Sequence, residues 1–163
     1  MISHLVKLTV PNATAEQFYN FMINPSSKRY REWWPGEHIA FYITKRGDKT
    51  HVGDEVFFDE YIGESRRLAF DGVVIRTDFP KVIIWQMKKA GIRLPATLRL
   101  DLRDSPGGVK VRHELRIGYN GIGKLLDPFI KLYFNESYSE ALTVHCQTEW
   151  HKLAVYLNTT KAD

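Results

Sequence analysis

The feature that most constrains this sequence is a run of strand-like segments from about residue 38 to residue 119. β-Branched and aromatic residues fill the segments, and glycine, proline and aspartate separate them, as at Ser105–Gly108 and from Gly91 to Pro95. The pattern predicts six strands, at about 38–45, 54–62, 67–78, 82–89, 96–104 and 108–118. The short turns between them indicate hairpins and an antiparallel meander.

The last two of these segments alternate strictly between apolar and polar residues. Leucines recur at every second position from Leu98 to Leu102, and Val109, Val111, Leu115 and Ile117 follow the same period in the final segment. Basic and acidic residues occupy most of the positions between them. One apolar and one charged face is typical of a sheet with one side in water. The apolar face therefore needs another element to cover it.

The N-terminal segment predicts one more strand and two short helices. Residues 2–10 are rich in β-branched and apolar residues and end at Pro11, which indicates a strand. Thr14 and Gln17 then have the spacing of a capping box. That helix is expected to end near Asn24–Pro25, and Pro25 can open a second short helix that runs to about Trp33.

The C-terminal segment predicts a long helix. Asp127–Pro128 is a favourable helix start, and no proline or glycine follows between Phe129 and about Leu157. Such a helix has roughly 29 residues and is about 40 Å long at 1.5 Å per residue. The sequence thus predicts a single α+β domain over residues 1–163, in which a curved seven-stranded antiparallel sheet surrounds a long C-terminal helix. We expect a cavity beneath that helix.

Composition sets further expectations. Cys146 is the only cysteine, so an internal disulfide is excluded and a cytoplasmic location is the default. No apolar run is long enough to span a bilayer. The net charge is +4, but the basic residues are scattered, so we expect no nucleic-acid partner. The oligomeric state is left open.

Several segments carry a resemblance to a known superfamily. The opening Val6–Phe18, the Trp33-Trp34-Pro35 element, Gly121–Leu126 and Ala141–Leu153 resemble the corresponding parts of the START-related (SRPBCC) superfamily, which includes polyketide cyclases, pollen allergens and lipid-transfer domains. The likeness covers nearly the whole chain. It implies a helix-grip fold and binding of a hydrophobic ligand between sheet and helix, and it implies no shared catalytic residues.

Two polar residues are the candidate catalytic groups. Strand alternation places His113 on the apolar face, where it could act as a general acid or base or bind a ligand oxygen. Glu60 shares its face with Val56 and Phe58, which would make it a buried carboxylate with a raised pKa. The opposite phase of that strand stays open. The alternative for both residues is a purely structural role.

The predicted ligand-binding set combines aromatic rings with residues of the apolar strand faces and one amide, Gln86. It consists of Trp33, Trp34, Phe41, Phe58, Trp85, Gln86, Leu98, Leu100, Val111, Tyr133 and Phe134.

No cofactor or metal is predicted. His145 and Glu149 are four residues apart and share a helix face, but His151 points well away from them and no His-Glu-x-x-His motif is present. Cys146 is interpreted as an inert buried thiol.

Three functions are compatible with these features. The first is a binding module for a small hydrophobic molecule such as a lipid, a polyketide or another aromatic. The second is an enzyme of the polyketide cyclase or aromatase type that uses His113 and Glu60. The third is a protein-interaction module, which would tolerate a filled interior. The carrier needs a cavity of roughly 300–1,000 Å³, and the enzyme needs two polar groups converging on one substrate atom.

Overall fold

The computed structural model describes residues 2–63, 66–118, 128 and 135–160. Its elements, in chain order, are β1 (Ile2–Pro11), α1 (Ala15–Ile23), α2 (Ser27–Trp33), β2 (His38–Lys45), β3 (Glu55–Ile62), β4 (Arg66–Asp78), β5 (Val82–Lys89), β6 (Ile92–Ser105), β7 (Gly108–Ile117) and α4 (Glu136–Thr159). The strands form one seven-stranded antiparallel sheet in the order β1-β7-β6-β5-β4-β3-β2. The predicted fold class and the meander are confirmed.

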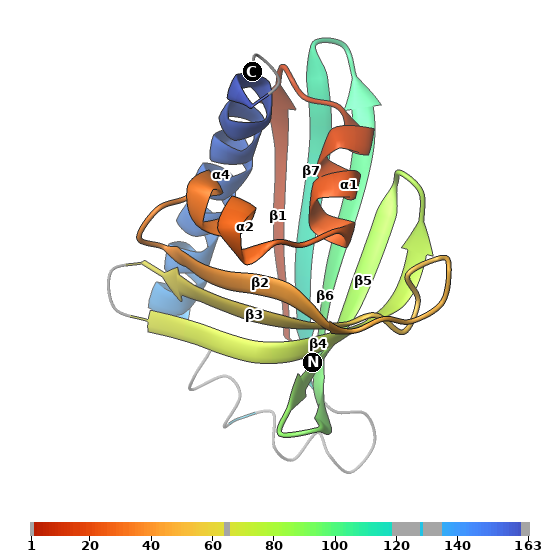
Figure 1. The fold of residues 1–163 in the computed structure, drawn as a ribbon. Coiled ribbons are helices and arrows are strands. Elements are labelled where there is room, and N and C mark those ends of the chain that lie inside the picture. Colours follow the sequence, from red (N-terminus) through yellow and green to blue (C-terminus); the bar gives the residue numbers. More distant parts are fainter. Residues whose placement is uncertain (1, 64–65, 119–127, 129–134, 161–163) are drawn as a thin grey trace.

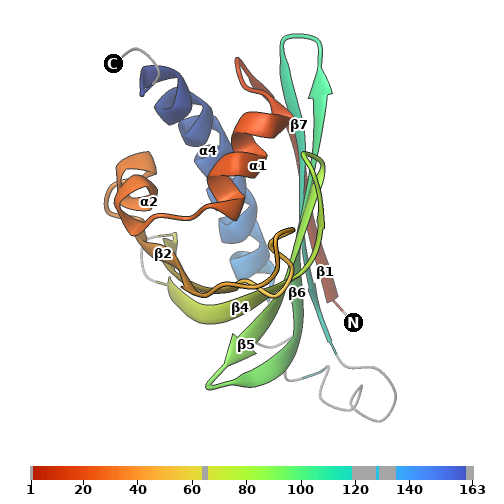
Figure 2. The ribbon, with the colours of Figure 1, turned by 45° about the vertical axis from the view of Figure 1, so that its right-hand side comes forward.

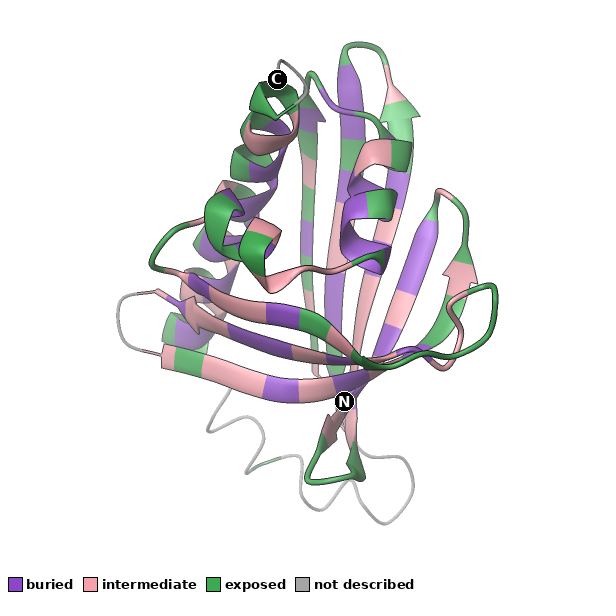
Figure 3. Ribbon diagram, viewed as in Figure 1, coloured by how far each residue is buried: buried purple, intermediate pink, exposed green. Residues whose placement is uncertain are grey.

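The sheet curves around the long helix. In Figure 1, β2, β3 and β4 run across the direction of β1 and β7, and Figure 2 shows α1, α2 and α4 on the concave side of the sheet. The side chains buried beneath the helices come from alternate strand positions, and Figure 3 shows this alternation along the strands.

The short helices form as the local sequence predicts. Thr14 and Gln17 make a reciprocal capping box: the Thr14 hydroxyl accepts from the Gln17 backbone N–H at 3.2 Å, and the Gln17 side chain accepts from the Thr14 N–H at 2.9 Å. Helix α2 begins at Ser27, two residues beyond Pro25. The Trp33 indole N–H donates to the backbone carbonyl of Glu149 at 2.7 Å, which fixes α2 against α4.

The long helix is shorter than expected. Asn135 has an extended backbone, and its side chain accepts from the Tyr138 N–H at 2.9 Å, so α4 starts at Glu136 rather than at Phe129. Asparagine is a favourable N-cap, because its side-chain oxygen accepts from a first-turn backbone N–H that has no partner within the helix. The rest of the predicted helix, residues 129–134, lies outside the described residues.

The β5–β6 turn is also tighter than expected. It is formed by Ala90 and Gly91, both with positive φ, and β6 already starts at Ile92. Pro95 lies inside the strand, where the β5–β6 register shifts between Gln86 and Lys88, and its carbonyl accepts from the Gly118 N–H. A bulge tolerates proline because the ladder hydrogen bond is already interrupted there. None of the described helices has the combination of length and apolar character needed to cross a membrane.

Candidate functional site

The interior between the sheet and α4 contains two small adjoining chambers. The first has a volume of about 40 Å³ and is lined by Met22, Tyr30, Trp33, Phe58, Glu60, Phe70, Trp85, Leu98, Leu100, His113, Leu142, His145, Cys146, Glu149 and Trp150. The second also has about 40 Å³ and shares Glu60, Phe70, Leu98, His113 and Leu142 with the first. Most of the lining is apolar, and its polar groups are histidines, glutamates, tyrosines and the Cys146 thiol.

The phase of β3 directs Glu60 inward. Val56, Phe58 and Ile62 are buried on the same face, and Asp59 points to the outer face, where Arg67 binds it at 2.6–2.8 Å. The Tyr30 hydroxyl donates a hydrogen bond to Glu60 Oε2. Burial raises the pKa of Glu60 to about 7, in spite of the opposing effects of His145 and Tyr30.

His113 also faces the interior. Its Nδ1 lies 2.9 Å from Cys146 Sγ and 3.7 Å from Glu149 Oε1. Burial lowers the pKa of His113 and raises the pKa of the Cys146 thiol well above its usual value. The thiol therefore keeps its proton at neutral pH and can donate it to His113 Nδ1, as is typical of an inert buried cysteine.

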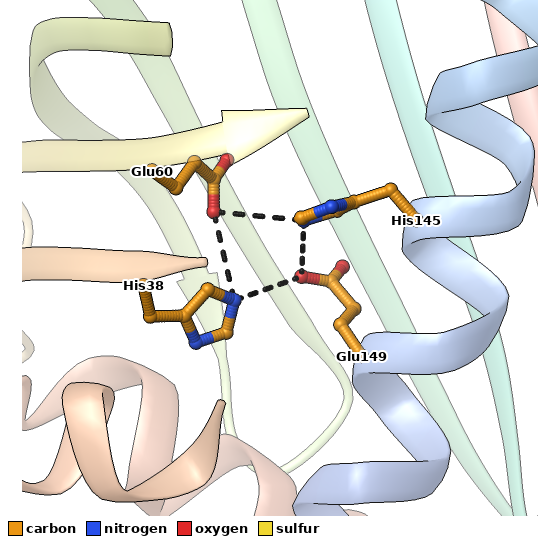
Figure 4. Close-up of side chains that lie close together, drawn as sticks. All are labelled: His38, Glu60, His145 and Glu149. Atoms are coloured by element: carbon orange, nitrogen blue, oxygen red, sulfur yellow. Dashed lines mark ion pairs between the residues drawn. The ribbon is translucent and has the colours of Figure 1, made fainter. Parts of the chain in front are cut away.

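The most concentrated polar feature is a tetrad formed by His38, Glu60, His145 and Glu149. Figure 4 shows the four side chains pointing toward one another from β2, β3 and α4. His38 Nε2 lies 3.8 Å from Glu60 Oε2 and 3.9 Å from Glu149 Oε2. His145 Nε2 lies 3.9 Å from Glu60 Oε2 and 3.6 Å from Glu149 Oε2. All four atoms are within 4.8 Å of one another.

The two histidines of the tetrad are held by aromatic rings. His38 stacks on Tyr30 with ring centroids 3.9 Å apart, and its Nδ1 lies 3.2 Å from the Tyr30 carbonyl oxygen. A carbonyl oxygen only accepts, so Nδ1 carries the hydrogen and Nε2 presents a lone pair to the tetrad. His145 stacks on Trp34 at 4.7 Å. The Nε2 atoms of both histidines are buried without a hydrogen-bond partner.

The charge states within the tetrad differ. Burial lowers the pKa of His38 to about 4, so this ring is neutral at physiological pH. For His145, burial lowers the pKa, but Glu149, Glu60 and Glu37 outweigh it and raise the pKa above the usual value. For Glu149, burial raises the pKa, while His145, His113 and His38 together lower it below the usual value. Imidazole nitrogens and carboxylate oxygens are donors suited to a divalent metal.

The structure places the predicted ligand-binding residues in three groups. Trp33, Phe58, Trp85, Leu98 and Leu100 line the first chamber. Trp34, Phe41 and Val111 do not line either chamber: Trp34 packs on His145, Phe41 stacks on Phe58, and Val111 is part of the core. Tyr133 and Phe134 lie outside the described residues.

Gln86 is in the predicted ligand-binding set, but it does not line either chamber. Ile83, Trp85 and Met87 are the buried, inward positions of β5, and the Gln86 amide donates to the carbonyls of Leu94 and Ala96. Its role is to bind the backbone at the β6 bulge, whose freed carbonyls need donors.

Sequence reasoning missed His38 and the assembly of the tetrad. His145 and Glu149 were recognised as sharing a helix face, but their partners come from strands about a hundred residues earlier in the chain. The available signal was strand phase: His38 begins β2 directly after the Trp33-Trp34-Pro35 element, and Glu60 is its register partner in β3. Without knowledge of the sheet curvature, nothing in the sequence brings these two strands to α4.

Comparisons with known proteins identify the fold. No family model matches the chain, and no curated protein matches it either. Among solved structures, Ara h 8.0201 is similar over 97% of this chain and 98% of its own, with 12% identity and a TM-score of 0.63. Protein MLL2253 from Mesorhizobium loti covers 98% of both chains at 14% identity and a TM-score of 0.58. The Aha1 dimer from Colwellia psychrerythraea covers 99% of this chain and 94% of that chain, at 16% identity and a TM-score of 0.50. At these identities the likeness concerns the fold, and it agrees with the helix-grip architecture that the superfamily resemblance implies.

Proposed function

We propose that this protein binds a small molecule with an apolar body and a polar end in the interior between the sheet and α4. The observation that carries the proposal is the composition of the interior wall, which is mostly apolar and carries converging histidines and glutamates. Binding pockets typically combine an apolar lining with a few placed polar groups that orient the ligand. The superfamily resemblance supports the same function.

The size of the chambers limits which ligands fit. A chamber of about 40 Å³ holds roughly three water molecules. Pockets for drug-sized ligands are about 300–1,000 Å³. In this conformation the interior accommodates a compact molecule, and a lipid or a long polyketide requires α4 to move away from the sheet.

The test is native mass spectrometry of the protein purified from its own host, compared with the denatured mass. A retained small molecule is expected, and its mass identifies its chemical class. Binding in vitro is followed by the fluorescence of Trp33, Trp85 and Trp150, which line the first chamber. Leu142→Trp fills the shared wall and should abolish the fluorescence response to the retained molecule. Leu5→Trp, on the exposed outer surface, is the matched control. Equal binding by both variants would place the ligand elsewhere.

A second candidate function is catalysis in the same interior. It is favoured by Glu60, whose pKa of about 7 suits a general acid or base at neutral pH. Together with His113 it lines both chambers. His113→Ala should abolish turnover of a substrate if the enzyme function is correct, and it should leave most of the affinity intact if the protein is a carrier.

The small interior volume is the observation that favours the third function, protein interaction. Its other requirement is a contiguous apolar patch. The exposed large apolar residues of the described chain lie on several elements, and α4 carries two of them, Val144 and Val155, eleven residues apart. Single exposed apolar residues are normal on any protein surface. Interior binding is therefore the better supported function.

A further inference from the structure

The spacing of the tetrad differs from that of a hydrogen-bonded cluster. The four histidine–glutamate distances are 3.6–3.9 Å, whereas N–H···O hydrogen bonds are about 2.7–3.2 Å long. Ligands at about 2.0–2.2 Å around a tetrahedral Zn²⁺ are separated by roughly 3.3–3.6 Å, from the geometry of a tetrahedron with those bond lengths. The tetrad has the arrangement of a slightly expanded coordination shell.

The neighbouring polar cluster provides an internal comparison. His113 Nδ1 and Cys146 Sγ are 2.9 Å apart, which is a direct hydrogen bond and is too close for two ligands of one metal ion. Glu149 takes part in both clusters, with Oε1 toward His113 and Oε2 toward the tetrad. His113 and Glu149, at 3.7 Å, have the same wide spacing as the tetrad, but the close His113–Cys146 contact leaves the tetrad as the better arranged of the two sets of ligand atoms.

The orientation of the histidines points to the same site. The side chain of His38 is 0% exposed and that of His145 is 3% exposed, and both Nε2 atoms are directed at carboxylate oxygens without a hydrogen-bond partner. For His38 the Tyr30 carbonyl holds the hydrogen on Nδ1, so that the Nε2 lone pair faces the oxygen lone pairs. A backbone carbonyl behind the distal ring nitrogen is the usual support of a metal-binding histidine.

Histidines are the neighbours that form ion pairs with the two tetrad carboxylates among the described residues. Glu60 and Glu149 are buried at the centre of the tetrad, and no lysine or arginine forms an ion pair with either of them in the part of the chain that the structure describes. Lysine or arginine would be a stronger counter-charge for two carboxylates at this depth than a histidine is. A divalent cation between the four atoms would neutralise both groups and satisfy both orphan nitrogens at once.

We propose that His38, Glu60, His145 and Glu149 bind one divalent transition-metal ion, with Zn²⁺ as the expected occupant. Two imidazoles and two carboxylates in tetrahedral arrangement match its preferences, whereas Mg²⁺ and Ca²⁺ prefer six or more oxygen ligands. Three of the four ligands line the first chamber, so the ion would border the space assigned to the small molecule. The metal site goes beyond the proposed binding function and does not depend on it.

The first experiment measures Zn²⁺ binding to the full chain after chelator treatment, by isothermal titration calorimetry and by elemental analysis after gel filtration. One Zn²⁺ per chain is expected. His145→Gln and Glu149→Gln should each weaken binding by about 100-fold or more, because even supporting residues of metal sites contribute roughly 10–100-fold. Mg²⁺ and Ca²⁺ at the same concentration should not compete.

The matched controls lie on the same helix. His151→Gln and Glu140→Gln change the same residue types at exposed positions of α4 and should leave Zn²⁺ affinity unchanged. Circular dichroism verifies that each variant is folded. If the tetrad variants fail to fold, Co²⁺ binding to the unaltered protein decides: a tetrahedral visible spectrum without thiolate charge-transfer bands is expected.

Three results would overturn the proposal. The first is no Zn²⁺ binding at 100-fold excess over protein. The second is binding that persists in both tetrad variants or disappears in His151→Gln, which would locate the metal on the surface. The third is a thiolate band in the Co²⁺ spectrum, which would transfer the site to Cys146 and His113.

Discussion

The two faces of the sheet treat buried carboxylates in opposite ways. On the outer face, Glu114 is 3% exposed and accepts from Ser3 at 3.0 Å, from Arg116 at 2.7 Å and from Arg112 at 2.8 Å. On the inner face, Glu60 and Glu149 face histidines at 3.6–3.9 Å, without an arginine or lysine partner among the described residues. The Glu114 side chain is 4% exposed and has donors on both oxygens, whereas the Glu60 side chain is 14% exposed and accepts from the Tyr30 hydroxyl.

The pKa values reflect this contrast for Glu60 but not for Glu149, whose pKa the neighbouring histidines hold below its usual value. For Glu114, burial raises the pKa, but Arg116, Ser3 and Arg112 outweigh it and hold the pKa below the usual value. For Glu60, burial prevails and raises the pKa to about 7. The comparison shows how the two kinds of buried carboxylate differ. A buried acid without hydrogen-bond donors and cationic partners is a candidate functional group, whereas one that has them has a structural role.

The largest expected effect is metal-linked stability. In Zn²⁺ at about 1,000 times its dissociation constant, the free energy of unfolding should rise by about 4 kcal/mol relative to chelator-treated protein. Urea denaturation in the two conditions measures it. His145→Gln should show no such rise, because the site is lost. If Zn²⁺ raised the free energy of unfolding of His145→Gln by the same amount, the inner-face carboxylates would not form the metal site.

The second effect concerns the inner carboxylate in metal-free protein. The pKa of Glu60 is about 7 in the folded state against 4.5 in an unfolded chain, so the native state binds the proton more tightly. Its contribution to stability is complete below pH 4.5 and is lost as the pH rises to 7, by up to about 3 kcal/mol.

Glu60→Gln should remove this loss, so that the variant becomes relatively more stable than the parent protein between pH 4.5 and pH 8. Comparing the two proteins cancels the opposite contribution of His38, whose pKa of about 4 makes stability rise with pH up to 6.5. Urea titrations in chelator at several pH values provide the measurement. If the difference in unfolding free energy between the two proteins did not change with pH, the neighbours of Glu60 would stabilise its charged form as those of Glu114 do.

On the outer face, replacing a buried glutamate by glutamine has the opposite effect on stability. Glu114→Gln should destabilise the protein by roughly 1–3 kcal/mol at pH 7, a range reduced because Arg112 and Arg116 are 36% and 51% exposed. Glu140→Gln, at an exposed position, is the control and should have no measurable effect. Because the pKa of Glu114 is lowered, its contribution is present above pH 4.5 and disappears as the pH falls below it.

The smallest expected effect concerns Tyr30, whose hydroxyl holds a tetrad carboxylate in place. Tyr30→Phe removes the hydroxyl that donates to Glu60 and keeps the ring that stacks on His38. Zn²⁺ affinity should fall by about 10-fold, at the lower end for a supporting residue. Calorimetric titration measures the change, with Tyr42→Phe on the exposed side of β2 as control. An unchanged affinity would show that the hydroxyl does not position the carboxylate.

The fold was largely predictable because its signals are local. The capping box of Thr14 and Gln17, the alternation from Leu98 to Leu102 and the turns between strands all lie within a few residues in sequence. Errors occurred where a local signal had two interpretations. The long helix was expected to run through Asn135, which is in fact its N-cap, and Gln86 was expected to bind ligand, although its amide binds the backbone of β6.

The sequence predicted the positions of individual site residues, but not that they come together. The expected inward positions of His113 and Glu60 followed from period-two alternation, and the shared face of His145 and Glu149 followed from helical spacing. What was absent is any rule that joins β2 and β3 to α4, because those contacts depend on how strongly the sheet curves.

By itself, the sequence determined the order of the elements and which face of each strand is apolar, because both follow from hydrogen-bonding geometry over a few residues. Only the tertiary structure decided that His38, Glu60, His145 and Glu149 meet. Their approach depends on the curvature of a seven-stranded sheet and on the depth at which α4 packs, and these result from the packing of the whole core. The same packing decided that the interior is two chambers of about 40 Å³ rather than one large cavity.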